Sequence, residues 1–108
     1  MTTNPSFTDN DSTRQFVDVL GAIRDEVTMQ KFLRDVMTEK EIIEMSARLQ
    51  AAKMLRDGAT YADITASTKL SSRTVARISD WLQNGAGGYD IALNMINAHH
   101  PHVPPARV

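Results

Sequence analysis

Residues 60–83 read TYADITASTKLSSRTVARISDWLQ, and this stretch decides the fold because it contains two helix starts separated by a short turn. Thr60 and Ser71 are of the kind preferred at a helix N-cap, where a side-chain oxygen accepts a hydrogen bond from a backbone N–H. Four apolar residues of the stretch are Ile64, Leu70, Val75 and Ile78. This spacing packs two short helices at a steep angle through a turn of about three or four residues. The stretch therefore predicts a helix-turn-helix.

The second helix of this motif would present its N-terminal part outward, in the position that enters a DNA major groove. Hydroxyl groups there can bond phosphates or base edges, a small methyl group can meet thymine, and an arginine can contact guanine through two hydrogen bonds. We expect the DNA-binding residues to be Thr60, Tyr61, Lys69, Ser71, Ser72, Arg73, Thr74, Ala76 and Arg77.

Two positions depart from the usual motif. The fifth position, usually a small residue, is Thr65, and the turn position usually given to glycine is Lys69. A left-handed backbone at a lysine would cost about 1 kcal/mol. Between residues 59 and 84 three basic and two acidic residues leave a net charge of only +1. A structural helical corner that binds no DNA is therefore an alternative interpretation of the same spacing.

The chain before this motif also has helical spacing. Apolar residues between Phe16 and Val27 form one stripe of an amphipathic helix, for which Ser12 is the expected N-cap. Thr28 is the expected cap of a short second helix. Beyond the motif, a last helix is expected to follow the glycine-rich residues 85–88. With no strand signal anywhere, the sequence predicts an all-α fold.

The longest helix is predicted to start at a capping box formed by Thr38 and Glu41 and to end at Gly58, a residue suited to the left-handed position after a helix. Its apolar residues occupy more than one face. A helix that is apolar on several sides must be covered on each of them, and its short neighbours offer little cover. We therefore expect a second subunit against it, in a homodimer.

Composition narrows the class of protein. The 108 residues fit a single domain, and the formal net charge of −1 gives no overall positive field. The chain has no cysteine, which excludes disulfide frameworks, cysteine-based zinc sites and thiol catalysis. It has neither an apolar run of the roughly 18 residues that a membrane helix needs nor a secretory pattern at its N-terminus. We therefore expect a cytoplasmic protein without membrane contact.

The two ends of the chain have compositions unlike the middle. Residues 1–11 are mostly polar, and residues 99–108 hold three histidines and three prolines. Both are expected to be disordered, leaving residues 12–98 as one helical domain. The histidines have no carboxylate or cysteine partner nearby, so neither a metal site nor a cofactor is predicted. With every histidine in this tail, an enzyme is not predicted either.

Several of these segments resemble one known family. The carrying residues are the box at residues 38–41, Arg48, Gly58 with Thr60-Tyr61-x-x-Ile64, the SRTVARI of residues 72–78 and the GAGGY of residues 85–89. Together they look like the Trp-repressor-like regulators, most closely the YerC/YecD-type branch, over about two-thirds of the chain. The resemblance implies an all-α fold, an intertwined homodimer with interlocking N-terminal helices, and operator binding.

The resemblance also raises the question of a ligand. In tryptophan-sensing members two arginines enclose the indole of the corepressor, and they match Arg48 and Arg77 here. A glycine and a serine that accompany them in those members are replaced here by Ile78 and Trp81. We expect these two side chains to fill the ligand space, with the Arg77 guanidinium over the Trp81 indole. Tryptophan is therefore disfavoured as an effector.

The sequence as a whole predicts a homodimeric regulator of transcription, a repressor, which binds a double-stranded DNA operator through its helix-turn-helix. The alternative is a dimeric helical protein-interaction module with little affinity for DNA, which the near-neutral charge and the lysine in the turn favour.

Overall fold

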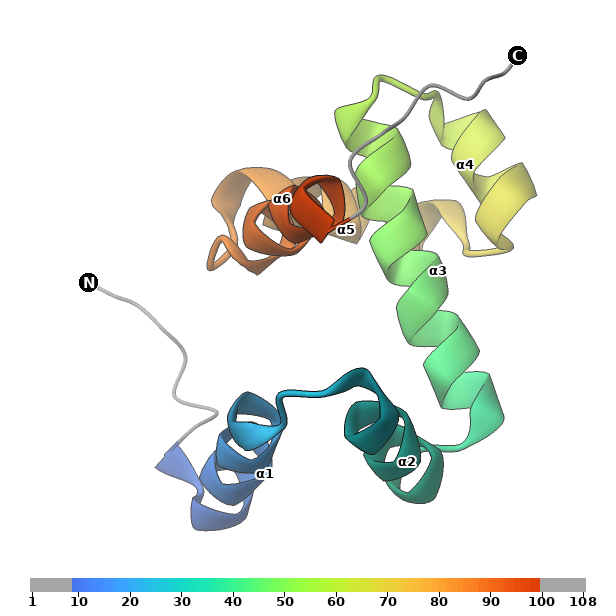
Figure 1. The fold of residues 1–108 in the computed structure, drawn as a ribbon. Helices are drawn as coiled ribbons and strands as arrows, with labels where there is room; N and C mark the ends of the chain where they lie inside the picture. The colour runs from blue at the N-terminus through green and yellow to red at the C-terminus, as the bar shows by residue number, and fades with distance from the viewer. Residues whose placement is uncertain (1–8, 100–108) are drawn as a thin grey trace. The chain divides into compact units, whose positions relative to one another are not determined.

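The computed structural model describes residues 9–99, which form six α-helices and no strand (Figure 1). The predicted all-α fold is confirmed. The helices are α1 (Asp11–Ala22), α2 (Glu26–Val36), α3 (Glu39–Arg56), α4 (Tyr61–Thr68), α5 (Ser72–Asn84) and α6 (Gly88–His99). The ends predicted to be disordered are shorter than expected, because Asn10 caps α1, Asp11 begins it and His99 ends α6. The rest of those two ends, residues 1–8 and 100–108, lies outside the described residues.

The chain divides into two compact units, with the boundary between Ile43 and Glu44 inside α3. The first unit holds α1, α2 and the beginning of α3. The second unit holds the rest of α3 together with α4, α5 and α6. The helix-turn-helix therefore lies wholly within the second unit.

The first two helices begin earlier than predicted. Asn10, not Ser12, caps α1, because its side-chain Oδ1 accepts hydrogen bonds from the backbone N–H groups of Ser12 and Thr13 at 2.9 and 3.1 Å. Asp25, not Thr28, caps α2, and its Oδ2 accepts from the N–H of Thr28 at 2.9 Å. Asn, Asp and Ser are about equally good caps and Thr is weaker, so a nearby Asn or Asp can take the position from either.

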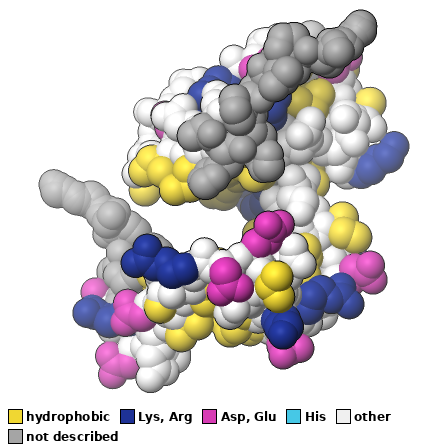
Figure 2. All heavy atoms as spheres, in the orientation of Figure 1, with side chains coloured by type: hydrophobic (Ala, Val, Ile, Leu, Met, Phe, Trp, Pro, Cys, Tyr) yellow, Lys and Arg dark blue, Asp and Glu magenta, His cyan; other side chains and the backbone are white. Residues whose placement is uncertain are grey.

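In the first unit, α1 and α2 bury no side chain completely. The rings of Phe16 and Phe32 lie 6.0 Å apart, which joins the two helices. Figure 2 shows hydrophobic side chains on the surface of this part, among charged ones. The large apolar side chains that stay exposed in this unit are Phe16, Val17, Val19, Val27, Val36 and Ile43.

Both ends of α3 have the structure predicted from sequence. The N–H of Thr38 donates to Glu41 Oε1 at 2.8 Å, and the N–H of Glu41 donates to Thr38 Oγ1 at 3.1 Å, which completes the capping box. At the other end Gly58 has φ +90°. The N–H groups of Gly58 and Ala59 reach back to the carbonyls of Leu55 and Met54 at 3.0 and 2.9 Å, the pattern of a Schellman motif.

A small apolar core joins the four helices of the second unit. Three of the four helix-turn-helix residues predicted to be apolar anchors, Ile64, Val75 and Ile78, are completely buried, while Leu70 is half-buried against them. The remaining buried residues in the described chain come from α3 and α6, namely Ala51, Ala52 and Leu93. The core therefore fixes α4 and α5 relative to the long helix.

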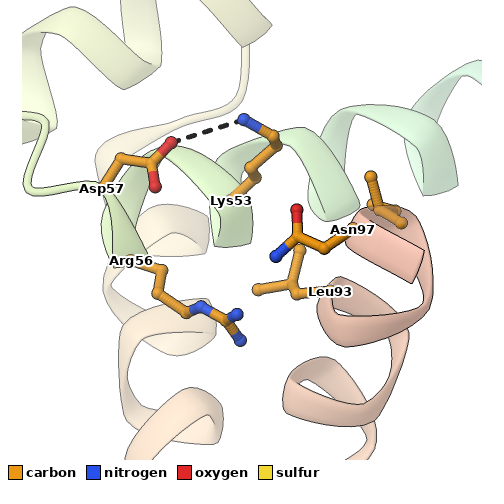
Figure 3. A pocket seen from close by; sticks show the side chains of 6 residues that line it. Lys53, Arg56, Asp57, Leu93 and Asn97 are labelled. Atoms are coloured by element: carbon orange, nitrogen blue, oxygen red, sulfur yellow. Dashed lines mark hydrogen bonds and ion pairs between the residues drawn. The ribbon is translucent and has the colours of Figure 1, made fainter. Parts of the chain in front are cut away.

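The last helix is held by a polar contact as well as by this core. Arg56 of α3 donates to Asn94 Oδ1 at 3.0 Å and lies 3.5 Å from Asp90 Oδ1, both on α6. Figure 3 shows Arg56 on one helix with Leu93 and Asn97 on the other. This contact could not be predicted from the sequence, because Asp90 and Asn94 lie 34 and 38 residues after Arg56.

Candidate nucleic-acid interface

The helix-turn-helix begins at Thr60, which caps α4. Its Oγ1 accepts a hydrogen bond from the N–H of Asp63 at 3.1 Å, as the sequence predicted. The hydroxyl still has its own hydrogen to donate. Tyr61, the next residue, is exposed and carries a second hydroxyl. Both side chains therefore lie at the N-terminal end of α4 with a donor available for a phosphate oxygen.

The turn between α4 and α5 contains the left-handed backbone whose cost in free energy was expected for a lysine at this position. Lys69 has φ 67° and ψ 8°, a left-handed conformation that no other residue except glycine adopts within residues 9–99. Its N–H donates to the carbonyl of Thr65 at 3.0 Å. The Thr68 hydroxyl donates to the Ile64 carbonyl at 2.8 Å and accepts from the N–H of Leu70 at 3.2 Å. Backbone groups and Thr68 hold the turn, and the Lys69 side chain is exposed.

The start of α5 is organised by Ser71, which caps the helix. Ser71 Oγ accepts from the N–H of Thr74 at 3.1 Å and donates to Thr74 Oγ1, also at 3.1 Å. The Ser71 hydroxyl is therefore committed within the chain, whereas Thr74 keeps its own hydroxyl hydrogen. Thr74 is half-buried, so the expectation that it faces outward with its neighbours is wrong: on α5 it shares a face with the buried Ile78, four residues further on. The predicted contact residues of α5 that are exposed are Ser72, Arg73, Ala76 and Arg77.

Charges in the second unit fall into two groups. The three basic residues of α3 in this unit each meet a carboxylate: Arg48 meets Glu44 at 2.9 Å, Lys53 meets Asp57 at 3.4 Å and Arg56 meets Asp90 at 3.5 Å. The basic residues of the helix-turn-helix have no carboxylate partner within the described chain, and all three are exposed: Lys69, Arg73 and Arg77. The positive charge available to an external anion is therefore concentrated on the predicted DNA-binding segment.

Arg48 and Arg77, the candidate ligand-binding pair, lie in different environments. Arg48 is half-buried, donates to Glu44, and has a buried Nε without a hydrogen-bond partner. Burial raises the pKa of Tyr89, an effect that the nearby positive charge of Arg48 partly opposes. Arg77 is exposed and has no carboxylate partner within residues 9–99. The two arginines therefore differ in burial and in partners.

Ile78 and Trp81, the two side chains expected to fill the ligand space, differ in burial. Ile78 is completely buried in the core, whereas Trp81 is 43% exposed. The expected stacking of Arg77 on Trp81 is absent from the described chain, where the aromatic contact present is that of Phe16 with Phe32. Trp81 points outward because Ile78 and Val75 occupy the inward face of α5.

The hollow drawn in Figure 3 is too small to be an ordinary ligand pocket. The hollow between α3 and α6 that Figure 3 shows has a volume of about 60 Å³ and is lined by Arg56, Leu93 and Asn97 among others. That volume is far below the roughly 300 Å³ of a small ligand pocket. Within residues 9–99 no three His, Asp or Glu side chains gather as metal ligands, and no helix is long and apolar enough to cross a membrane.

Comparison with known proteins agrees with this geometry. Residues 11–97 match the family described as Trp repressor protein. The uncharacterized YerC protein of Bacillus subtilis (strain 168) is 32% identical over 82 residues, which cover 76% of this chain and 79% of that protein. Two solved structures share the fold, and in each of them the match covers nearly the whole length of the solved chain.

The first of these structures is a TrpR-like protein from Eubacterium eligens ATCC 27750, with a TM-score of 0.77, 30% identity, and coverage of 85% of this chain and 95% of that one. The second is a Staphylococcus aureus protein, with a TM-score of 0.75, 28% identity, and coverage of 86% and 96%. The predicted family is confirmed, and its members are DNA-binding regulators rather than enzymes. This chain, with its helix-turn-helix and exposed unpaired cations, belongs to the Trp repressor family.

Proposed function

We propose that the protein is a cytoplasmic transcriptional repressor that binds a specific double-stranded DNA operator as a homodimer. In this proposal residues 12–98 act as one Trp-repressor-like domain, and the helix-turn-helix of residues 60–83 is its DNA-binding element. The N-terminus of α5 enters the major groove, and α4 crosses the DNA backbone.

One observation carries the proposal: Lys69, Arg73 and Arg77 are exposed and have no carboxylate partner within residues 9–99, while each basic residue of α3 in the same unit has one. Unpaired cations on one segment attract a polyanion, because each can neutralise a phosphate and release a counterion. An interaction surface for a neutral protein would gain nothing from leaving these charges unpaired.

The predicted contacts divide by chemistry. Three exposed residues of α5 are suited to base edges, since Arg73 and Arg77 can each contact guanine and Ala76 can meet a thymine methyl group. The remaining residues are suited to the sugar-phosphate backbone. Those residues are Thr60, Tyr61, Lys69, Ser72 and Thr74, together with Ser71, which would use its backbone N–H group because its hydroxyl already bonds Thr74.

Homodimer formation is supported by apolar surface that one chain leaves uncovered. Val27, Val36 and Ile43 of the first unit are 60%, 48% and 61% exposed. An amphipathic helix gains most of its stability from burying its apolar face, and α1 and α2 bury no side chain fully. An intertwined partner with interlocking N-terminal helices would cover these faces. The melting temperature should then rise with protein concentration, and a concentration-independent value with a monomer mass would contradict the dimer.

Tryptophan is not part of this proposal. Ile78 lies in the closed core, and moving it aside for an indole would lose burial worth about 2–3 kcal/mol. We therefore propose that Arg48 and Arg77 stabilise the chain or contact phosphate rather than bind an amino acid.

The proposal is tested by selecting binding sites from random double-stranded DNA with the full chain. A recovered palindrome supports both the operator and the two-fold dimer. Arg73→Ala should then weaken binding to that site by about 1–3 kcal/mol if Arg73 reads a base edge. Lys40→Ala, which removes an exposed lysine outside the motif, serves as the matched control and should bind as the wild type does.

Failure to select any sequence, with no affinity for DNA even at low salt, would contradict the proposal. It would favour the interaction-module alternative. An equal loss on selected and random DNA for Arg73→Ala would instead assign Arg73 to a phosphate.

A further inference from the structure

We propose that Lys69 is a phosphate-binding residue that fixes how the helix-turn-helix sits on DNA, and that the left-handed turn presents it at a cost in stability. This inference rests on the proposed function, because it assigns one role within the same interface. It predicts a trade-off: relieving the turn should stabilise the protein and weaken its hold on every DNA sequence.

The backbone at Lys69 is the first observation. Its φ of 67° is the one positive φ of a residue other than glycine within residues 9–99. An L-residue in this region places its Cβ close to a backbone oxygen, so the conformation is unfavourable for all but glycine and, to a lesser degree, Asn and Asp. Asn and Asp can compensate with a short local hydrogen bond, which a lysine side chain cannot provide.

The second observation is that the fold does not use the Lys69 side chain. The turn is closed by the N–H of Lys69 on the Thr65 carbonyl and by the two hydrogen bonds of the Thr68 hydroxyl. The lysine is exposed, and no carboxylate partner is present for it within the described residues. Glycine would satisfy the same backbone without the steric cost.

The third observation is the position of the turn. Lys69 lies directly after α4 and three residues before α5, whose N-terminal N–H groups also favour a phosphate. When the start of a recognition helix enters the major groove, the turn before it comes close to the backbone at the groove edge. A lysine there can neutralise a phosphate but carries no sequence information.

A purely structural reason for the lysine also exists, and the experiment must separate the two. A cation at the C-terminus of α4 interacts favourably with the helix dipole. Three variants of the full chain make the distinction. Lys69→Gln removes the charge and keeps the strained backbone, Lys69→Gly removes both, and Lys69→Arg keeps both. Lys40→Gln is the matched control for losing an exposed lysine elsewhere.

Binding is measured by fluorescence anisotropy of a labelled operator, and of a random duplex of equal length, from 50 to 300 mM salt. We expect Lys69→Gln and Lys69→Gly to weaken binding to both duplexes at 0.15 M salt. The affinity should fall by about fivefold for each Lys69 side chain of the bound protein that is lost from a phosphate. The slope of log affinity against log salt should fall by about 0.9 for each lysine lost. Lys69→Arg and Lys40→Gln should match the wild type in both measurements.

Thermal unfolding without DNA supplies the second readout. Lys69→Gly should raise the Tm by about 4–8 °C, because it removes about 1 kcal/mol of left-handed strain. A Lys69→Gln variant that melts lower but binds both duplexes with the wild-type affinity and salt slope would overturn the inference, and the dipole would then explain the lysine. A wild-type protein that binds neither duplex would overturn the proposed function and this inference with it.

Discussion

The binding of DNA should depend steeply on salt, to an extent set by the number of unpaired cations. Each chain carries three of them on the helix-turn-helix, Lys69, Arg73 and Arg77, so a dimer brings six. If all six lie against phosphates, log affinity should fall against log salt with a slope of about −5, since each contact contributes about −0.9. If Arg73 and Arg77 contact guanine instead, the two Lys69 side chains alone should give a slope of about −2. With all six on phosphates, raising salt from 50 to 200 mM should weaken binding roughly a thousandfold.

The measurement is a series of equilibrium titrations of labelled operator at five or six salt concentrations, with wild type and two variants. Arg77→Gln should reduce the steepness by nearly two per dimer, one contact from each chain. Lys53→Gln, whose charge is already paired with Asp57, should leave the slope unchanged. A slope near zero would refute the assignment of any of these cations to phosphates, and a slope near −2 would leave only Lys69 of each chain on a phosphate. A slope well beyond −6 would mean that paired cations of α3 or residues of the first unit also reach the DNA.

Three further predictions test the fold and the effector. Gly58→Ala should destabilise the protein by about 1 kcal/mol, whereas Gly21→Ala should stabilise it by about 0.5–1 kcal/mol: an added Cβ meets nothing at either position, and only Gly58 has a positive φ. Urea unfolding compares the two, and equal effects would contradict the backbone argument. The hydrogen bonds from Thr28 lower the pKa of Asp25, so the stability that this carboxylate contributes is present above its usual pKa and is lost as the pH falls through the lowered value. Asp25→Asn keeps a hydrogen-bond acceptor at the cap of α2 but has no carboxyl group to protonate. Its helix content, followed by circular dichroism in acid, should therefore depend less on pH than that of the wild type. Millimolar tryptophan should leave operator affinity unchanged, and a tryptophan-dependent gain would restore Arg48 and Arg77 as ligand residues.

Local chemistry made most of the fold predictable. The capping box at Thr38 and Glu41 and the left-handed Gly58 depend on residues within a few positions of one another, so the sequence contains all the information they need. The first two caps were misplaced for an equally local reason, because Asn10 and Asp25 compete with the chosen Ser12 and Thr28 over the same few residues. A sequence pattern ranks neighbouring N-cap candidates only by the preference of each residue type for that position.

The site was harder to predict where burial decides it. Spacing identified Ile64, Val75 and Ile78 as the anchors, and all three are completely buried. Spacing alone did not show that Thr74 turns partly inward or that Trp81 turns outward, since both depend on which face of α5 meets the core. The contact of Arg56 with α6 joins residues far apart in sequence, and no local pattern announces it.

The near-neutral composition does not by itself argue against DNA binding, because the acidic residues of the motif lie apart from its basic residues. Asp63 lies in the first turn of α4, where the helix dipole favours a negative charge, and Asp80 accepts a hydrogen bond from Asn84 at 3.0 Å. Neither carboxylate pairs with Lys69, Arg73 or Arg77 within residues 9–99. A formal charge of −1 sums over such local arrangements and hides them. Under the proposed function three cations per chain make a small footprint on DNA, so we expect strong binding to need two copies on one duplex. The apolar side chains that α1 and α2 leave exposed offer a surface that would hold two copies together.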